Sequence, residues 1–156
     1  MVEQKETVGD EHPLSDRIQL ILLAFLICIW VTDSFFLRRY ILTNIPWLFR
    51  LSAAVILVLI GVYLIEKSHK LVIDAEKPQL ITTGVYSVTR HPMYLGIMLF
   101  ELGIVTTTLS IPALLFWVLI FLAYNNFAFF EEESLIKNIG DEYRNYMRQV
   151  RRWVVF

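Results

Sequence analysis

The sequence predicts an all-α polytopic membrane protein with about four transmembrane helices, including a C-terminal helical hairpin, and a cytoplasmic amphipathic tail helix. Three observations support this fold class. Hydrophobic residues make up 56% of the 156 residues, compared with about 45–50% in a typical soluble domain. The mean hydropathy is +0.56, and only 19% of the residues are charged. The apolar residues are also gathered in long blocks that contain almost no charge.

The composition excludes several other classes of protein. With 14 basic and 15 acidic residues, the net charge is −1, so no nucleic-acid-binding surface is expected. The single cysteine, Cys28, excludes an internal disulfide framework. Three scattered histidines, at positions 12, 69 and 91, lack the spacing of a metal site, and no metal is expected. The length fits one membrane domain over residues 1–156.

Two apolar segments in the first half of the chain are long enough to cross a bilayer. The polar residues 1–17 are expected to form a flexible N-terminus. The first span covers residues 18–37, and no basic segment precedes it as in a cleaved signal peptide. Asp33 lies near the outer end of this span, where we expect it to be solvated. The second span covers residues 46–65 and is short enough to favour some tilt.

The third apolar block predicts the helical hairpin. Residues 93–130 contain one charge, Glu101, in 38 residues. A single helix of that length would measure roughly 57 Å at about 1.5 Å per residue, which is too long for one crossing. The stretch from Thr106 to Pro112 combines β-branched residues, a serine and a proline suited to a first helical turn. We therefore expect two arms, at residues 93–108 and 111–130.

The asymmetry of basic residues sets the orientation. With four crossings, eleven basic residues fall on the side of the N-terminus, the 66–92 loop and the 131–156 tail. Only Arg38, Arg39 and Arg50 fall on the other side. The positive-inside rule therefore places both termini and the 66–92 loop in the cytoplasm.

The tail after Phe130 has the pattern of an amphipathic helix. Its apolar residues recur at spacings of 4, 4, 3 and 4, at Leu135, Ile139, Tyr143, Tyr146 and Val150. Basic residues lie off this stripe, where they can face anionic lipid headgroups. Gly140 is expected to kink or split the helix, with Asp141 as the cap of the second piece.

Two polar clusters beside the membrane segments could bind a ligand. In the first, Pro92 is suited to the first position of a helix, whose free N–H groups together with Arg90 favour a carboxylate or phosphate. The second is the run Glu131–Glu133, whose mutual repulsion a cationic or hydroxyl-bearing ligand would relieve. The two clusters lie on the same predicted side and together favour a zwitterionic ligand.

Residues 80–153 resemble the integral-membrane methyltransferases, a group that includes isoprenylcysteine carboxyl methyltransferase and phosphatidylethanolamine N-methyltransferase. The first half of the resemblance is the pattern Gly84-x-Tyr86-x-x-x-Arg90-His91-Pro92-x-Tyr94-x-Gly96. After the hydrophobic hairpin follows Glu131-Glu132-x-x-Leu135-x-x-x-Ile139-Gly140-x-x-Tyr143-x-x-Tyr146-x-x-x-Val150-x-Arg152-Trp153. Both halves occur in order with the hairpin between them, which makes the resemblance specific.

The resemblance implies an enzyme that transfers a methyl group from S-adenosylmethionine to a lipophilic or membrane-partitioned acceptor. The partners would be the lipid bilayer and a lipophilic small molecule or lipid, and the site would lie on the cytoplasmic side. The residues implied in cofactor binding are Tyr86, Arg90, His91, Pro92, Tyr94, Gly96, Glu131 and Glu132.

Two further residues are candidates for the catalytic step. Glu101 is ionisable within an apolar span, which makes it a functional candidate, although a structural hydrogen bond would explain it equally well. Arg152 fits the pattern of the resemblance and could tie the tail over the site, although basic residues in such tails more often face lipid.

The identity of the acceptor stays open at the level of sequence. Members that methylate a carboxylate carry an arginine shortly before the glutamates, whereas this chain has Tyr124-Asn125-Asn126-Phe127 there. An isoprenylcysteine carboxylate, an aminophospholipid and a thiol are therefore all alternatives. Two other functions remain: a sterol-reductase-like oxidoreductase that uses a nicotinamide cofactor, and a non-catalytic lipid-binding module. The oligomeric state does not follow from the sequence.

Overall fold

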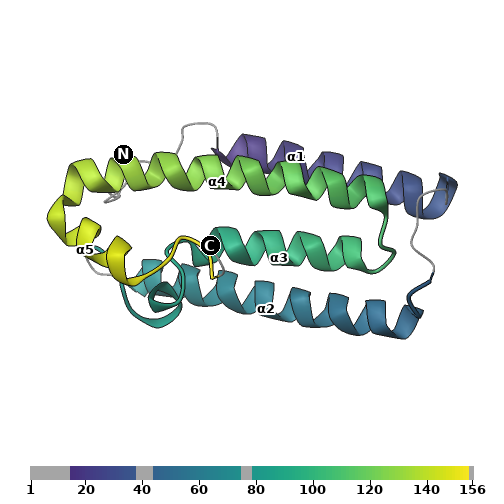
Figure 1. Cartoon of the computed structure of the whole chain (residues 1–156), viewed down its shortest axis with the longest axis horizontal. Coiled ribbons are helices and arrows are strands. Elements are labelled where there is room, and N and C mark those ends of the chain that lie inside the picture. Colours follow the sequence, from purple (N-terminus) through teal and green to yellow (C-terminus); the bar gives the residue numbers. More distant parts are fainter. Residues whose placement is uncertain (1–14, 38–43, 75–78, 155–156) are drawn as a thin grey trace, which may run out of the picture.

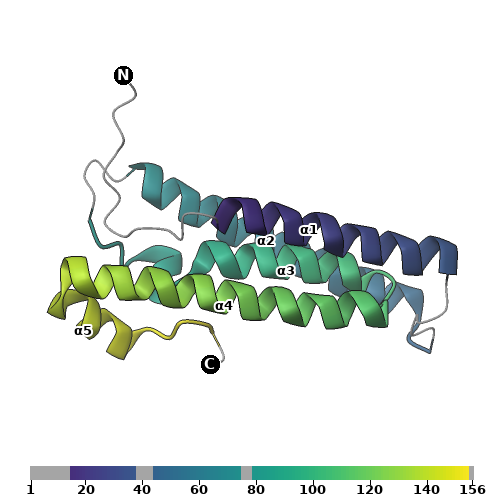
Figure 2. The same cartoon turned by 90° about the horizontal axis from the view of Figure 1, so that it is seen from above.

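The structure, a computed structural model, describes residues 15–37, 44–74 and 79–154. Its helices are α1 (Ser15–Val31), the π-helical turn η1 (Thr32–Leu37), α2 (Trp47–Asp74), the 3₁₀ turn η2 (Gly84–Ser87), α3 (Pro92–Thr106), α4 (Ile111–Ile139) and α5 (Asp141–Gln149). The helices α1, α2, α3 and α4 run lengthwise in one elongated bundle, and α5 folds back at one end (Figures 1 and 2). The described residues contain no β-strand.

The predicted fold class, an all-α polytopic membrane protein, is confirmed. Among the described residues, three helical segments are long and apolar enough to cross a membrane: Ser15–Leu37, α2 and α4. The shorter apolar helix α3 has 15 residues, about 22 Å at about 1.5 Å per residue. This is less than the roughly 30 Å of a hydrocarbon core, as expected for a short first arm of the hairpin.

Two helices continue beyond the segments expected from hydropathy. The helix α2 extends past Ile65 to Asp74, and α4 extends past Phe130 to Ile139. An apolar segment ends where charged residues begin. Glu, Lys and Leu are nevertheless good helix formers, so the helical hydrogen bonding continues beyond the apolar segment. Consequently, Glu131–Glu133 lie inside α4 and not in a separate tail.

The hairpin between α3 and α4 forms at the expected break. Leu109 adopts a left-handed conformation with φ of 53° in the turn. The Ser110 side chain caps α4 by accepting a hydrogen bond from the Ala113 N–H at 3.4 Å, and Pro112 stands in the first turn. The β-branched, serine and proline residues thus end one helix and start the next.

Polar side chains join η1 to this hairpin turn. Ser110 donates a hydrogen bond to the Asp33 Oδ2 atom at 2.6 Å, and the Trp30 indole donates to the Thr108 hydroxyl at 2.9 Å. Asp33 is buried, so the expectation that it is solvated was wrong. The turn between α3 and α4, which hydropathy places at a membrane surface, is covered by the end of α1 and by η1.

Small residues bring α2 and α3 into backbone contact. A Cβ atom at Gly61 would lie 2.6 Å from the Gly96 carbonyl oxygen, and one at Gly103 would lie 3.0 Å from the Ala54 carbonyl oxygen. Such close approach is typical of membrane helices that pack through glycines. Gly96 therefore faces α2, and this crossing sets the position of α3 within the bundle.

The other side of α3 meets α4 through much larger side chains. Figure 1 shows α3 between α2 and α4. The buried core on this side includes Tyr94, Met98 and Val105 of α3 with Ile120 and Tyr124 of α4. The Trp117 indole of α4 donates to the Met98 carbonyl oxygen at 2.9 Å. Large side chains thus fill this interface.

The separate second piece of the tail is confirmed as the amphipathic helix α5. Gly140 has a φ of 73° and separates α4 from α5. Tyr143 and Tyr146 are buried. Asp141, however, does not cap α5 with its side chain and instead pairs with Arg144 at 2.8 Å. The left-handed glycine alone turns the chain, because residues without a Cβ adopt this conformation readily.

Candidate active site

The chain after α5 returns along the segment that leads into α3 (Figure 1). The Arg90 N–H donates to the Arg151 carbonyl oxygen at 3.0 Å, and the Arg90 guanidinium donates to the Val150 carbonyl oxygen at 2.7 Å. The Thr89 hydroxyl donates to the Arg152 carbonyl oxygen. These bonds hold residues 150–153 against the start of α3, so the two halves of the sequence motif meet in space.

Glu132 lies at the centre of this meeting point. Its Oε1 atom lies 2.9 Å from Arg90 Nη2 and 3.1 Å from His91 Nε2. Its Oε2 atom lies 2.6 Å from Arg152 Nη2, and the Glu132 side chain is only 3% exposed. One buried carboxylate therefore joins three cationic or ionisable groups from the segment before α3 and from the tail.

The neighbouring glutamates differ sharply from Glu132. Glu131 is 27% exposed and contacts His91 Nδ1 at 3.4 Å. Glu133 is 55% exposed and pairs loosely with Lys137 at 3.7 Å. We use the name ionic cluster for Arg90, His91, Glu131, Glu132 and Arg152. Only two of the three consecutive glutamates belong to it, since successive helical residues point about 100° apart.

The electrostatic environment favours the protonated form of His91. Burial by itself lowers the pKa of this side chain, but hydrogen bonds and charge attraction from Glu131 and Glu132 outweigh burial and raise the pKa above its usual value. The protonated imidazole donates from both nitrogens, one to each glutamate.

This raised pKa predicts a stability that falls as the pH rises. Because the pKa of His91 is higher in the folded than in the unfolded state, its contribution is complete below the unfolded value of about 6.5. It is lost as the pH rises through the folded value. We expect the melting temperature of the wild type to decrease above about pH 6.5 relative to that of His91→Gln. Parallel melting curves of the two proteins from pH 6 to 9 would contradict this prediction.

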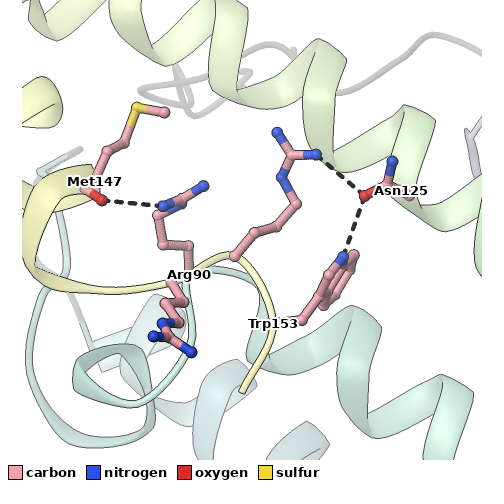
Figure 3. A pocket seen from close by; sticks show the side chains of 6 residues that line it. Arg90, Asn125, Met147 and Trp153 are labelled. Carbon is pink, nitrogen blue, oxygen red and sulfur yellow. Dashed lines mark hydrogen bonds between the residues drawn. The ribbon is translucent and has the colours of Figure 1, made fainter. Parts of the chain in front are cut away.

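Asn125 is a site residue that sequence reasoning missed. Figure 3 shows Asn125 and Trp153 turned toward each other at the edge of a hollow, and the indole donates to the Asn125 Oδ1 atom at 3.2 Å. Arg152 donates to the same oxygen at 3.1 Å. The Arg152 guanidinium of the tail thus lies beside residues 124–127, the stretch that contains no arginine in this sequence. No local pattern could reveal this, because the two residues are 27 positions apart.

In the described part of the chain, two hollows are lined by residues of the ionic cluster, and another lies nearby. The hollow in Figure 3 has a volume of about 380 Å³ and is lined by Arg90, Asn125, Met147, Arg151, Arg152 and Trp153. A smaller one of about 40 Å³ is lined by Tyr86, Arg90, His91, Pro92, Met93, Tyr94 and Glu131. A third, of about 460 Å³, lies between the segment before α3 and α5 and includes no residue of the ionic cluster. Arg90 lines the first two hollows.

The structure gathers most of the predicted cofactor residues, but not all of them. Tyr94 stacks on His91 with ring centroids 5.6 Å apart, and Pro92 occupies the first position of α3. The Tyr86 carbonyl oxygen accepts a hydrogen bond from Tyr146 at 2.6 Å. Gly96 lies on the α2 side of α3, away from these residues. Its predicted contact with the cofactor stays a prediction.

The two residues predicted to be catalytic lie in different places. Arg152 is part of the ionic cluster, and its ion pair with Glu132 joins the tail to α4. Glu101 is buried further along α3, nine residues after Pro92, or about 13 Å at about 1.5 Å per residue. The structure therefore does not place Glu101 in the ionic cluster.

Comparison with known proteins identifies the family. A family model described as phospholipid methyltransferase matches residues 49–142, which is more than half of the 156 residues. No curated protein and no solved structure matches the chain significantly. The matched segment begins in α2, includes α3 and α4, and ends in the first turn of α5. The predicted resemblance is confirmed, and the chain belongs to the phospholipid methyltransferase family.

Proposed function

We propose that this membrane methyltransferase takes its methyl group from S-adenosylmethionine and transfers it to a lipophilic acceptor that reaches the site through the bilayer. The observation that carries the proposal is the ionic cluster, in which Glu132 holds Arg90, His91 and Arg152. Family membership supports methyl transfer over the nicotinamide-dependent and non-catalytic alternatives.

The hollow in Figure 3 offers the best fit for the cofactor. Its volume of about 380 Å³ lies within the range of about 300–1,000 Å³ that is typical of small-molecule sites, whereas about 40 Å³ does not. The guanidinium groups of Arg90 and Arg152 suit the carboxylate of the methionyl group. Trp153 offers an aromatic surface for the adenine ring.

The two glutamates of the ionic cluster have different proposed roles. Glu132 is buried and fully engaged by cations of the chain, so it orders the site without needing to touch the cofactor. Glu131 is partly exposed and lines the small hollow beside His91. Because Arg90 lines both this hollow and the one in Figure 3, we assign Glu131 to a positively charged group of a cofactor that extends past Arg90 toward His91.

Bound S-adenosylmethionine would supply an electrophilic methyl group on a sulfonium sulfur. The chain contributes position and charge: Glu132 of α4 holds the guanidinium groups of Arg152 and Arg90, and Asn125 of α4 holds the Trp153 indole. Positioning of this kind accounts for a large share of the rate enhancement in displacement reactions. We propose that this end of the bundle faces the cytoplasm, because the basic residues Lys137, Arg144 and Arg148 lie beside it.

Titration calorimetry with S-adenosylhomocysteine tests this function in purified protein. We expect the wild type to bind and His91→Ala to bind at least about tenfold more weakly, because Glu131 and Glu132 lose their shared donor. The matched control is His69→Ala, since His69 is exposed on α2 far from the ionic cluster in sequence. Binding of a nicotinamide dinucleotide in place of S-adenosylhomocysteine, or equal affinity in the wild type and His91→Ala, would overturn the proposal.

A further inference from the structure

The hollow in Figure 3 has an unbalanced charge. Among the described residues, its lining contains three guanidinium groups and no carboxylate: Arg90, Asn125, Met147, Arg151, Arg152 and Trp153. Glu132 pairs with Arg90 and Arg152 but is not part of this lining, and its side chain is buried. Glu131 lines the smaller hollow instead. One buried carboxylate therefore offsets the charge of two arginines, and the hollow keeps an excess of positive charge.

Asn125 contacts the tail through a single atom. Its side-chain oxygen Oδ1 accepts one hydrogen bond from Arg152 Nη1 at 3.1 Å and one from the Trp153 indole at 3.2 Å. An amide oxygen has two lone pairs, so it satisfies both donors. The Nε and Nη2 atoms of Arg152 donate to Glu132. Two residues of α4 thus hold the guanidinium of Arg152 in place.

The spacing of Asn125 and Glu132 explains why both contact the same arginine. They are seven residues apart in α4, which is about two helical turns, so they lie on the same face of the helix. The next residue, Asn126, is rotated by about 100° and is exposed. Two adjacent side chains of identical chemistry therefore differ in position, and Asn125 is the one that lines the hollow.

The hydrogen bonds by themselves do not require an amide at position 125. A carboxylate has almost the same shape, accepts hydrogen bonds from the same two donors and binds a guanidinium more strongly. An aspartate would therefore hold the tail at least as well. It would also offset the charge of Arg152 a second time, in addition to Glu132. The choice between asparagine and aspartate at this position is thus a choice of charge and not of geometry.

We propose that Asn125 is a positioning and specificity-determining residue, which fixes Arg152 and Trp153 while it leaves the hollow positive for a ligand carboxylate. The inference rests on the proposed function, in which this hollow takes the carboxylate of the methionyl group. Arg152 uses three of the five N–H groups of its guanidinium in its bonds to α4. In the described part of the chain, the other two stay available to a ligand.

Two ligands that differ only in the carboxylate test the inference. They are S-adenosylhomocysteine and its decarboxylated analogue, in which the same thioether sulfur carries a 3-aminopropyl group. Each ligand is titrated by calorimetry into the detergent-solubilised wild type, Asn125→Asp, Asn125→Leu and the control Asn126→Asp. The control adds the same charge one residue away, at an exposed position outside the lining.

The expected results separate charge from position. Asn125→Asp should bind S-adenosylhomocysteine at least about tenfold more weakly, because like charges repel, and should bind the analogue as tightly as the wild type or more tightly. Asn125→Leu should weaken the binding of both ligands, because Arg152 and Trp153 lose their shared acceptor. Asn126→Asp should change either affinity by less than about twofold, as expected for an exposed charge.

Melting temperatures of the same preparations separate this role from a structural one. The new ion pair with Arg152 should keep the melting temperature of Asn125→Asp at or above that of the wild type. A lower melting temperature for Asn125→Asp would contradict the inference, because the carboxylate would then not replace the amide. Equal loss of affinity for the two ligands in Asn125→Asp, or for S-adenosylhomocysteine in Asn125→Asp and Asn126→Asp, would overturn it as well.

Failure of the inference can be distinguished from failure of the proposed function. If S-adenosylhomocysteine binds the wild type and Asn125→Asp equally well, the proposed function stands and only the role of Asn125 is wrong. If S-adenosylhomocysteine does not bind the wild type, the proposed function fails first, and the inference fails with it.

Discussion

Replacement of Glu132 by glutamine is expected to destabilise the protein by about 3–5 kcal/mol, the usual cost of breaking a buried ion pair from one side. The substitution keeps the shape of the side chain and removes its charge. Arg90, His91 and Arg152 would then face one another without the carboxylate that joins them. We also expect the tail to separate from α4, because the Arg152 guanidinium makes two hydrogen bonds to Glu132.

The adjacent glutamate provides the control. Glu133→Gln removes the same charge one residue away, but Glu133 is exposed and its ion pair with Lys137 is 3.7 Å long. Exposed pairs contribute about 0–1 kcal/mol, so little change is expected. Thermal unfolding in detergent and limited proteolysis of the tail measure both effects. If Glu132→Gln and Glu133→Gln melt at the same temperature, the central position of Glu132 is wrong.

Replacement of Gly61 by valine is the second change for which we expect a large effect. The new Cβ atom would lie 2.6 Å from the Gly96 carbonyl oxygen and 2.9 Å from the Phe100 backbone nitrogen. Both neighbours are backbone atoms, so the helices must move apart to relieve the clash. Overpacking of this kind costs about 1–3 kcal/mol and sometimes more. Because α3 also carries Pro92 and Tyr94, we expect weaker binding of S-adenosylhomocysteine as well.

Ala53→Val adds the same type of side chain to an exposed position of α2 and serves as the control. The melting temperature in detergent should fall for Gly61→Val and stay near that of the wild type for Ala53→Val. A Gly61→Val protein as stable as the wild type would show that α2 and α3 do not touch through Gly61.

Much of the fold could be predicted because hydropathy and helix-breaking residues act locally. The apolar blocks identify the membrane helices, and Ser110 and Pro112 divide the block of residues 93–130 where the hairpin turns. Gly140 separates α4 from α5 through its left-handed conformation. The ends of α2 and α4 could not be predicted in this way, because charged residues stop a hydropathy plot without stopping a helix.

The candidate site was predictable in its residue types and only partly in its arrangement. The motif indicated Arg90, His91 and the glutamates, and these residues do meet. The burial of Asp33 and the contact of Asn125 with Arg152 and Trp153 depend on segments far apart in the chain. The periodicity of apolar residues cannot predict such contacts, because they form only when the helices pack together.

By itself, the sequence determined that this chain is a helical membrane protein with a basic motif and an acidic motif in the order of the family. Only the tertiary structure decided which glutamate is central. Once α4 continues through Phe130, Glu132 falls on the buried stripe with Tyr124 and Ala128, at steps of four residues. Glu131 and Glu133 are rotated away by about 100° each. All three glutamates carry the same charge. Only Glu132 lies on the packed face of α4, where it contacts Arg90, His91 and Arg152.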